Sequence, residues 1–318
     1  MYDVTALGEL LIDFTPSGKS AAGMRLFEQN PGGAPCNVLA ALNKCGLKTA
    51  FIGKVGNDMH GLFLKETLEN AGICTDGLIV DDNVFTTLAF VALNDAGERS
   101  FSFARKPGAD TCLEEAEVNV SLLKDSKIFH VGSLSLTDEP AKSATLFALE
   151  KAKELGCTIS YDPNYRAALW SSKDAAIAGM REVLPFVEVM KMSDEETELL
   201  TGIKEPAEAA AYLVEHGIPL VAVTLGAEGA YVCTKEGGQV VSGFKSQVVD
   251  TTGAGDSFWG GFLYGLVKSG KKPAEVTLEE AVGFARFANA LASLCVEKRG
   301  GIPAMPELCA IEERLSSL

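Results

Sequence analysis

Short β-prone runs alternate with amphipathic helical segments along most of this chain, and that alternation is the strongest constraint on its fold. Residues 4–12 predict a strand, 35–45 a helix, 50–55 a strand and 62–71 a helix, and the same order resumes between residues 128 and 224. Repeated strand-then-helix order predicts an α/β fold with a mainly parallel sheet covered by helices on both faces. In such sheets, ligands bind beyond the carboxyl ends of the strands.

One segment interrupts this order. Residues 86–93 and 99–105 predict the two strands of a hairpin, with a turn at Asn94-Asp95-Ala96-Gly97 between them. Together with the polar, glycine-containing stretch 15–29, the hairpin predicts a small β insertion between the strand–helix units. The pattern alone leaves two interpretations open, a sheet edge and a lid that excludes water from a reacting group.

Composition narrows the classes of function. The 43 acidic residues outnumber the 28 basic ones, and the net charge of −15 argues against a nucleic-acid partner. No apolar run approaches the roughly 18 residues that a membrane span needs. The eight cysteines are scattered without a CxxC pair, and the first residues lack a basic, apolar leader. These features predict a cytoplasmic protein with reduced thiols and no membrane segment.

A glycine-rich turn, Asp250-Thr251-Thr252-Gly253-Ala254-Gly255-Asp256, follows a β-prone run and leads into an apolar stripe of helical period. Two glycines around Ala254 let consecutive backbone N–H groups converge at the positive end of a helix, which predicts a phosphate or oxyanion pocket without a basic side chain. An acid beside an anion pocket repels the anion, so Asp256 suggests a base. Taken alone, an ordinary turn with an aspartate helix cap explains the same residues.

A second group of polar residues lies near the start of the chain. Asp13 is expected to close the first strand, so that its carboxylate projects into the crevice. Gly32 and Gly33 allow close approach of a ligand to the backbone, and Asn37 follows in the first turn of a helix. Aspartate and asparagine can together bind vicinal hydroxyls, which indicates a carbohydrate. Each residue taken singly also fits an ordinary structural role.

Other motifs are incomplete. Residues 17–20 resemble the end of a P-loop, but Asp13 stands where the first glycine is required. Residues 253–255 begin like a dinucleotide fingerprint, but Phe258 stands at the third glycine position. The three histidines have no metal-ligand spacing. Hydrolase, dehydrogenase and zinc-enzyme activities are therefore disfavoured.

The segments 32–38 and 250–256 together resemble the two signatures of the ribokinase-like (PfkB) carbohydrate kinases, and residues 8–14, 51–58 and 162–166 fall in the family's order. Within the family, the Gly-Gly-Ala-Pro form and the Asp-Pro-Asn segment are most similar to fructokinases. The resemblance implies a ribokinase-like three-layer α/β/α fold with a small β-sheet lid. It implies a single domain over residues 1–318, with the lid formed by insertions at about 14–31 and 85–110.

The activity that the resemblance implies is transfer of the γ-phosphoryl group of Mg-ATP to a sugar hydroxyl. D-fructose, converted to fructose 6-phosphate by direct in-line transfer without a phospho-enzyme, is the expected substrate. Two alternatives stay open at this point. One is 2-keto-3-deoxygluconate kinase or another PfkB sugar kinase, and the other is a sugar-sensing protein that keeps the fold without turnover.

The resemblance also implies roles residue by residue. Asp256 would be the general base that removes the proton from the sugar hydroxyl. The backbone N–H groups that would hold the transferring phosphoryl group belong to Gly253, Ala254, Gly255 and Asp256. The residues expected to bind the substrate are Asp13, Gly32, Gly33, Asn37, Arg105 and Arg166, of which Arg166 is the better placed for phosphate. The residues expected to line the nucleotide site are Thr224, Gly226, Gly229 and Asn289.

Cations and assembly follow from the same resemblance. Mg²⁺ would bridge the phosphates largely through water, with Glu196 in its outer shell. Ser193 stands where many members of the family have asparagine, so metal and phosphate sensitivity could differ. A monovalent cation, K⁺, is expected near Asp250 and Thr252. The resemblance further implies a homodimer formed through the lid.

Overall fold

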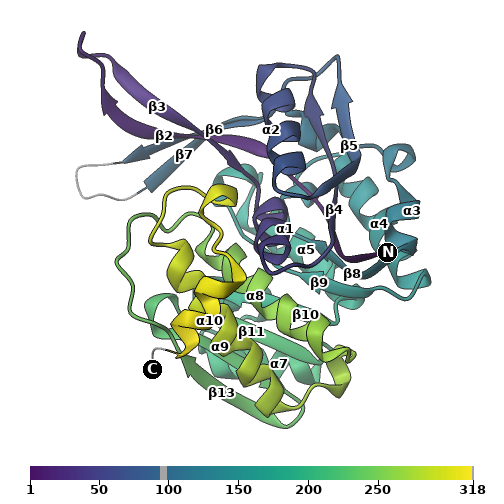
Figure 1. Ribbon diagram of the computed structural model, residues 1–318. Helices are drawn as coiled ribbons and strands as arrows, with labels where there is room; N and C mark the ends of the chain where they lie inside the picture. Colours follow the sequence, from purple (N-terminus) through teal and green to yellow (C-terminus); the bar gives the residue numbers. More distant parts are fainter. Residues whose placement is uncertain (94–98, 317–318) are drawn as a thin grey trace.

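The computed structural model describes residues 1–93 and 99–316, and nine strands form its central sheet in the order β13-β12-β11-β10-β9-β8-β1-β4-β5 (Figure 1). Every pairing from β11 through β5 is parallel, whereas β12 and β13 are antiparallel additions at one edge. The mainly parallel sheet predicted from the sequence is thus confirmed. The strands are β1 (Tyr2–Leu7), β4 (Thr49–Gly56), β5 (Cys74–Asp81), β8 (Ser126–Val131), β9 (Thr158–Tyr161), β10 (Val189–Ser193), β11 (Leu220–Thr224), β12 (Gly229–Thr234) and β13 (Gly237–Ser242).

Helices cover both faces of this sheet, because successive side chains of a strand point to opposite faces. On β8, Ile128 packs into one hydrophobic core and its neighbour Phe129 into the other. The first core includes side chains of α1 (Ala34–Lys44), α2 (Met59–Asn70), α8 (Ala254–Ser269), α9 (Leu278–Cys295) and α10 (Leu308–Ser316). The second includes side chains of α3 (Val120–Lys124), α4 (Ala141–Glu154), α5 (Lys173–Glu182), α6 (Thr197–Thr201) and α7 (Pro206–Glu215).

A glycine, Gly260, allows close packing between α1 and α8. Gly260 of α8 faces α1, and a Cβ atom at this position would lie 2.6 Å from the Cβ atom of Ala41 and 3.1 Å from the carbonyl oxygen of Val38. Without a side chain at Gly260, the two helices pack closely. Their N-terminal ends therefore lie near each other at the carboxyl edge of the parallel strands.

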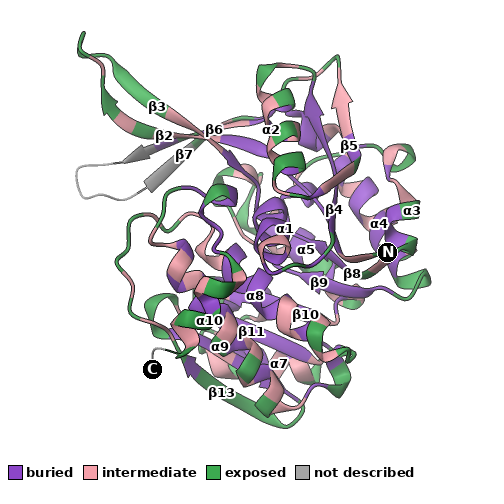
Figure 2. Cartoon of the chain, in the orientation of Figure 1, coloured by how far each residue is buried: buried purple, intermediate pink, exposed green. Residues whose placement is uncertain are grey.

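A second sheet of four strands, in the order β3-β2-β6-β7, projects from one side of the molecule (Figure 1). Its strands are β2 (Leu11–Lys19), β3 (Arg25–Gly32), β6 (Leu88–Leu93) and β7 (Arg99–Ala104). The outer parts of β2 and β3 are largely exposed, as the green segments of Figure 2 show. The two stretches predicted as a β insertion thus form one sheet, and the predicted turn at 94–97 lies outside the described residues.

One local prediction is wrong. Residues 4–12 are not one strand, because β1 ends at Leu7 and β2 begins at Leu11 in the other sheet. The chain changes sheets at Gly8, where a side chain would collide with Pro35 at the start of α1. The β-prone residues 247–249 before the glycine-rich turn form no strand, and Val249 donates its backbone N–H to the carbonyl oxygen of Val296. Within the described residues, no helix is both long and apolar enough to cross a membrane.

Candidate active site

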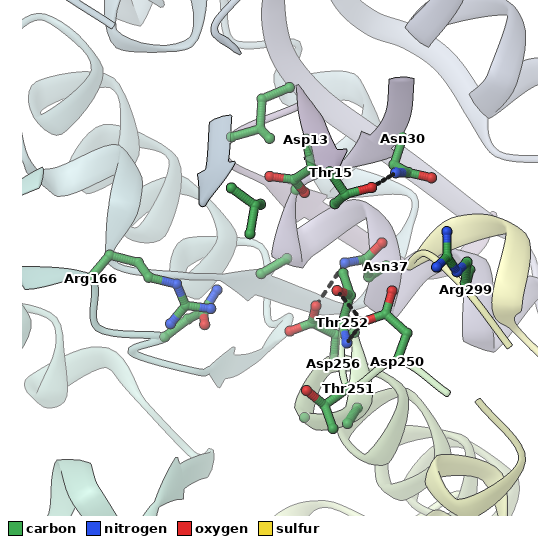
Figure 3. Close-up of a pocket in the computed structure, with 18 of the residues that line it drawn as sticks. Asp13, Thr15, Asn30, Asn37, Arg166, Asp250, Thr251, Thr252, Asp256 and Arg299 are labelled. Carbon is green, nitrogen blue, oxygen red and sulfur yellow. Dashed lines mark hydrogen bonds between the residues drawn. The ribbon is translucent and has the colours of Figure 1, made fainter. Parts of the chain in front are cut away.

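A cavity of about 510 Å³ lies between the second sheet and the N-terminal ends of α1 and α8. Figure 3 shows its polar side chains arriving from separate parts of the chain, with Asp13 on β2, Asn37 on α1, Arg166 after β9 and Asp256 on α8. The structure therefore brings the two sequence signatures, 32–38 and 250–256, to one place. This is the position at which a parallel α/β sheet binds its ligands.

A direct hydrogen bond joins the two signatures. Nδ2 of Asn37 donates to Oδ2 of Asp256 over 2.8 Å, although 219 positions separate the residues in the sequence (Figure 3). Both residues are buried. Oδ1 of Asn37 is also buried and accepts no hydrogen bond within the described residues. A buried acceptor of this kind is normally satisfied, so the site offers Asn37 to a donor such as a sugar hydroxyl.

The turn before α8, predicted as an anion cradle, has a backbone suited to that role. Gly253 has φ +74, a left-handed conformation that favours glycine, and a Cβ atom on it would lie 3.1 Å from the Cα atom of Gly301. In the described chain, Ala254 donates its backbone N–H to Thr251 and no backbone acceptor takes the N–H groups of Gly255 and Asp256. These two groups point from the positive end of a helix and can hold an anion.

The cradle does include a basic side chain, which corrects the prediction from the sequence. Lys191 lies on β10 and lines the cavity, and its ammonium makes an ion pair of 2.8 Å with Asp162. A Cβ atom on Gly255 would lie 3.0 Å from Nζ of Lys191, so the ammonium sits directly beside the cradle.

The surroundings of Asp256 suit a base that works near neutral pH. Burial raises the pKa of its carboxyl to about 6, and the nearby carboxylate of Asp162 acts in the same direction. Lys191, the hydrogen bond from Asn37 and the guanidinium of Arg166 oppose this rise. Asp256 is thus ionised at pH 7 and basic enough to accept a proton as a hydroxyl oxygen attacks.

Asp13 lies in the second sheet and not at the end of a central strand, yet it faces the cavity as predicted. Burial raises the pKa of Asp13 to about 6, while Arg166 lowers it. Gly32 on the neighbouring β3 leaves room for this carboxylate, because a Cβ atom on Gly32 would overlap Oδ2 of Asp13. Gly33 has φ +122 and lies against the carbonyl of Glu9, where a side chain would collide with the backbone.

The two predicted arginines have different positions. Arg166 is exposed, lines the cavity and donates from Nη1 to the carbonyl oxygen of its neighbour Tyr165. Arg105 is buried and does not line the cavity, so its assignment to the substrate site stays a prediction. Its guanidinium pairs with Asp110 over 2.7 Å and donates to the carbonyl oxygen of Leu134 and to Thr137. The protein itself takes up the donors of Arg105.

The four residues predicted for the nucleotide lie together, outside this cavity. Thr224 ends β11, and the turn that carries Gly226 and Gly229 follows it. Asn289 on α9 donates from Nδ2 to the carbonyl oxygens of Val241 and Ser242 over 2.9 and 3.1 Å. Gly229 has φ +110, and a Cβ atom on it would collide with the backbone of Val241 and Ser242. Asn289 and the glycine turn therefore both lie against the end of β13.

The residues predicted near metal ions already hold the loops around the cradle. Glu196 accepts the backbone N–H groups of Tyr165 and Ser193 over 2.6 and 2.7 Å, so it fits an outer-shell role and not direct coordination. Asp250 accepts the N–H and hydroxyl of Thr252 with one oxygen and the N–H of Gly300 with the other. Among the described residues, no cluster of three or more His, Cys, Asp or Glu side chains forms a metal site.

Comparison with known proteins settles the family. Residues 1–308 match the family model described as pfkB family carbohydrate kinase. The chain belongs to this family. The kinase is 44% identical over 307 residues to probable fructokinase-5 of Arabidopsis thaliana, covering 95% of this chain and 94% of that protein. It is 42% identical over 317 residues to fructokinase-2 of Oryza sativa subsp. japonica, covering 98% and 94%.

Solved structures confirm the ribokinase-like fold of the kinase. It resembles fructokinase with bound ATP from Xylella fastidiosa with a TM-score of 0.91 and 33% identity, covering 99% of both chains. It resembles fructokinase from Vibrio cholerae O395 in its fructose, ADP and calcium ion bound form with a TM-score of 0.88 and 35% identity, again over 99% of both chains.

Among the cavity residues of the kinase that sequence reasoning did not assign to the site, Glu9, Asn164 and Lys191 have unusual surroundings or backbone. Glu9 is buried and accepts the backbone N–H of Ala34, and burial raises the pKa of its carboxyl to about 7. Asn164 has φ +46, a conformation that is uncommon outside glycine and clusters at functional sites. Lys191 is the third. A lysine between apolar residues of a predicted central strand was the available signal, because lysine is rarely buried without a partner.

Proposed function

We propose that this chain is an ATP-dependent fructokinase that converts D-fructose and Mg-ATP to fructose 6-phosphate and ADP. The observation that carries the proposal is the hydrogen bond from Asn37 to Asp256, since it joins the amide proposed to bind a sugar hydroxyl to the carboxylate proposed as the base. The named fructokinase relatives at 42–44% identity support fructose as the sugar. The structures of relatives with bound ATP and with fructose and ADP support the substrate pair.

In the proposed reaction, Asp256 accepts the proton of the sugar 6-hydroxyl while that oxygen attacks the γ-phosphorus of ATP. The new O6–P bond forms as the bond from the γ-phosphorus to the β–γ bridging oxygen breaks, and ADP leaves. The N–H groups of Gly255 and Asp256 hold the charge on the transferring group. Asp13 and Asn37 bind other sugar hydroxyls, and Arg166 meets the phosphates from the opposite wall.

We also propose positions for the nucleotide and its cations. ATP would extend from the cradle toward the cluster formed by Thr224, Gly226, Gly229 and Asn289. Mg²⁺, bound to phosphate oxygens, would neutralise charge on the triphosphate, with Glu196 reached through water. A monovalent cation such as K⁺ would lie near Asp250 and Thr252, because the Asp250 carboxylate already joins two loops there.

The second sheet would act as the lid in this single-domain kinase. On this sheet, Glu28 accepts hydrogen bonds from Nη1 of Arg299 with both carboxylate oxygens, over 3.0 and 2.9 Å, at the cavity rim. Apolar side chains on the same sheet are exposed, and a second copy of the lid would cover them in a homodimer: Met24, Leu26, Phe27 and Phe90. The free thiols of all eight cysteines suit the cytoplasm as the compartment.

The experiment that tests the proposal measures ADP release from Mg-ATP with D-fructose, 2-keto-3-deoxygluconate, D-ribose or no sugar. The expected result is release that depends on fructose and exceeds the other sugars in kcat/KM. Higher kcat/KM with 2-keto-3-deoxygluconate would refute fructose as the substrate while keeping the kinase. Binding of sugar without any release of ADP would favour a sugar-sensing protein.

A further inference from the structure

Lys191 is a buried cation, and its ammonium needs nearby groups that compensate its charge. It is 5% exposed, and on β10 its neighbours Met190 and Met192 point into the core on the opposite face of the sheet. Alternation along the strand therefore directs Lys191 toward the face covered by α8. Burial of a lysine without compensating charge is unfavourable, so its partners indicate what the position is for.

Protein groups take up only part of the hydrogen-bonding capacity of this ammonium. Among the described residues, Asp162 is its one hydrogen-bond acceptor and ion-pair partner, at 2.8 Å. A lysine ammonium carries three hydrogens, so two remain without a protein acceptor there. Lys191 lines the cavity, and a Cβ atom on Gly255 would lie 3.0 Å from its Nζ, which places the ammonium beside the cradle.

The charges around Lys191 explain why a cation is needed at this point. Asp162, Glu196 and Asp256 all lie close enough to raise its pKa against the lowering effect of burial. Behind it, His130 is neutral, since burial and Lys191 lower the pKa of that ring to about 3. The other cations that line the cavity, Arg166 and Arg299, are exposed, and a bound triphosphate would add more negative charge beside the buried acids.

We propose that Lys191 is a further functional residue of the kinase, whose ammonium donates a hydrogen bond to the phosphoryl group as it passes from ATP to the sugar. This inference rests on the proposed kinase function and not on the identity of the sugar. Lys191 stays protonated throughout, and the proton of the hydroxyl goes to Asp256. The contact strengthens as the phosphoryl group approaches the cradle, so it acts on kcat more than on ATP affinity.

The test compares Lys191→Met with the double variant Asp162→Asn/Lys191→Met, which removes both charges of the pair. Lys54→Met is the matched control, because Lys54 is also buried, pairs with Asp81 and Glu117, and does not line the cavity. The assays are kcat with saturating Mg-ATP and whichever sugar the wild type phosphorylates, and the affinity for Mg-ADP with and without aluminium fluoride, a mimic of the transferring phosphoryl group.

We expect the double variant to fold, because neither member of the buried pair is left without its partner, and to have a kcat lower by about 10²–10³-fold. The gain in Mg-ADP affinity from aluminium fluoride should shrink in both Lys191 variants and stay unchanged in Lys54→Met. A double variant with wild-type kcat and an undiminished fluoride effect would overturn the proposal, since the pair would then be structural. Failure of the kinase function itself would appear differently, as wild-type protein that releases no ADP with any sugar.

Discussion

Replacing Asp256 by asparagine should make the protein more stable and nearly inactive. The substitution removes the base but keeps an oxygen that can accept the 2.8 Å hydrogen bond from Asn37. The pKa of Asp256 rises from 3.8 to about 6 on folding, so the folded state binds this proton more tightly than the unfolded chain. Its stabilising effect is complete below about pH 4 and lost as the pH rises through 6.

The size of the effect follows from that difference in pKa. At about 1.4 kcal/mol per pKa unit, ionisation of Asp256 costs the free protein about 3 kcal/mol at pH 8. Asp256→Asn avoids this cost, so its free energy of unfolding relative to wild type should increase by about 3 kcal/mol between pH 4 and pH 8. Urea unfolding at the two pH values measures it, and kcat should fall by about 10²–10⁴-fold.

Two results would refute this reasoning. A stability difference between the variant and wild type that does not change with pH would show that burial does not raise the pKa of Asp256. A kcat within about tenfold of wild type would show that another group accepts the hydroxyl proton, given the usual contribution of a general base. Mg-ATP affinity measured by calorimetry is the control, and it should be retained.

Three further predictions concern the walls of the site. In wild type, kcat/KM should fall below about pH 6, because protonation of Asp256 and of Asp13, whose pKa is also raised to about 6, removes the base and a sugar ligand; a profile flat down to pH 5 would contradict this. Gly32→Ala should displace the Asp13 carboxylate and raise KM for fructose about 10- to 100-fold, which is the effect of losing one hydrogen bond to a charged group. The control is Gly283→Ala on an exposed turn of α9, which should leave KM unchanged and stabilise the fold by about 0.5–1 kcal/mol. Glu28→Gln should raise KM for fructose only a few-fold and make it insensitive to salt, since the pair with Arg299 is exposed; equal salt dependence in variant and wild type would exclude a role for this pair in closing the lid.

The arrangement of the fold could be predicted from the sequence, because it follows from the hydrophobic periodicity of the segments and from the order of strands and helices. Alternation of strands and helices predicted the parallel sheet. The stretch 15–29 and the hairpin at 86–105, which interrupt that alternation, predicted the β insertion that forms the second sheet. The change of sheets at Gly8 could not be predicted, because the β-prone pattern continues across it from Leu7 to Leu11. Pro35 leaves no room for a side chain at Gly8, and only the folded chain shows this.

The site was predictable as far as its residues lie in short motifs. Asn37 and Asp256 were each expected from the turns that carry them, but no local pattern indicates that they bond to each other. Arg105 was assigned to the substrate because of its motif, although Asp110, five positions later, is what its guanidinium contacts. Lys191 was missed because its role depends on the helix end that packs over β10, and that packing is tertiary.

The measurement that tests the central claim most directly identifies the product. The kinase, Mg-ATP and D-fructose are coupled to phosphoglucose isomerase and glucose 6-phosphate dehydrogenase, so that only fructose 6-phosphate yields NADPH, while ADP is measured in parallel. We predict one NADPH for each ADP, and neither product from Asp256→Asn at a comparable rate. ADP formed from fructose without NADPH would contradict transfer to the 6-hydroxyl, and with it the proposed orientation of the sugar against Asp256.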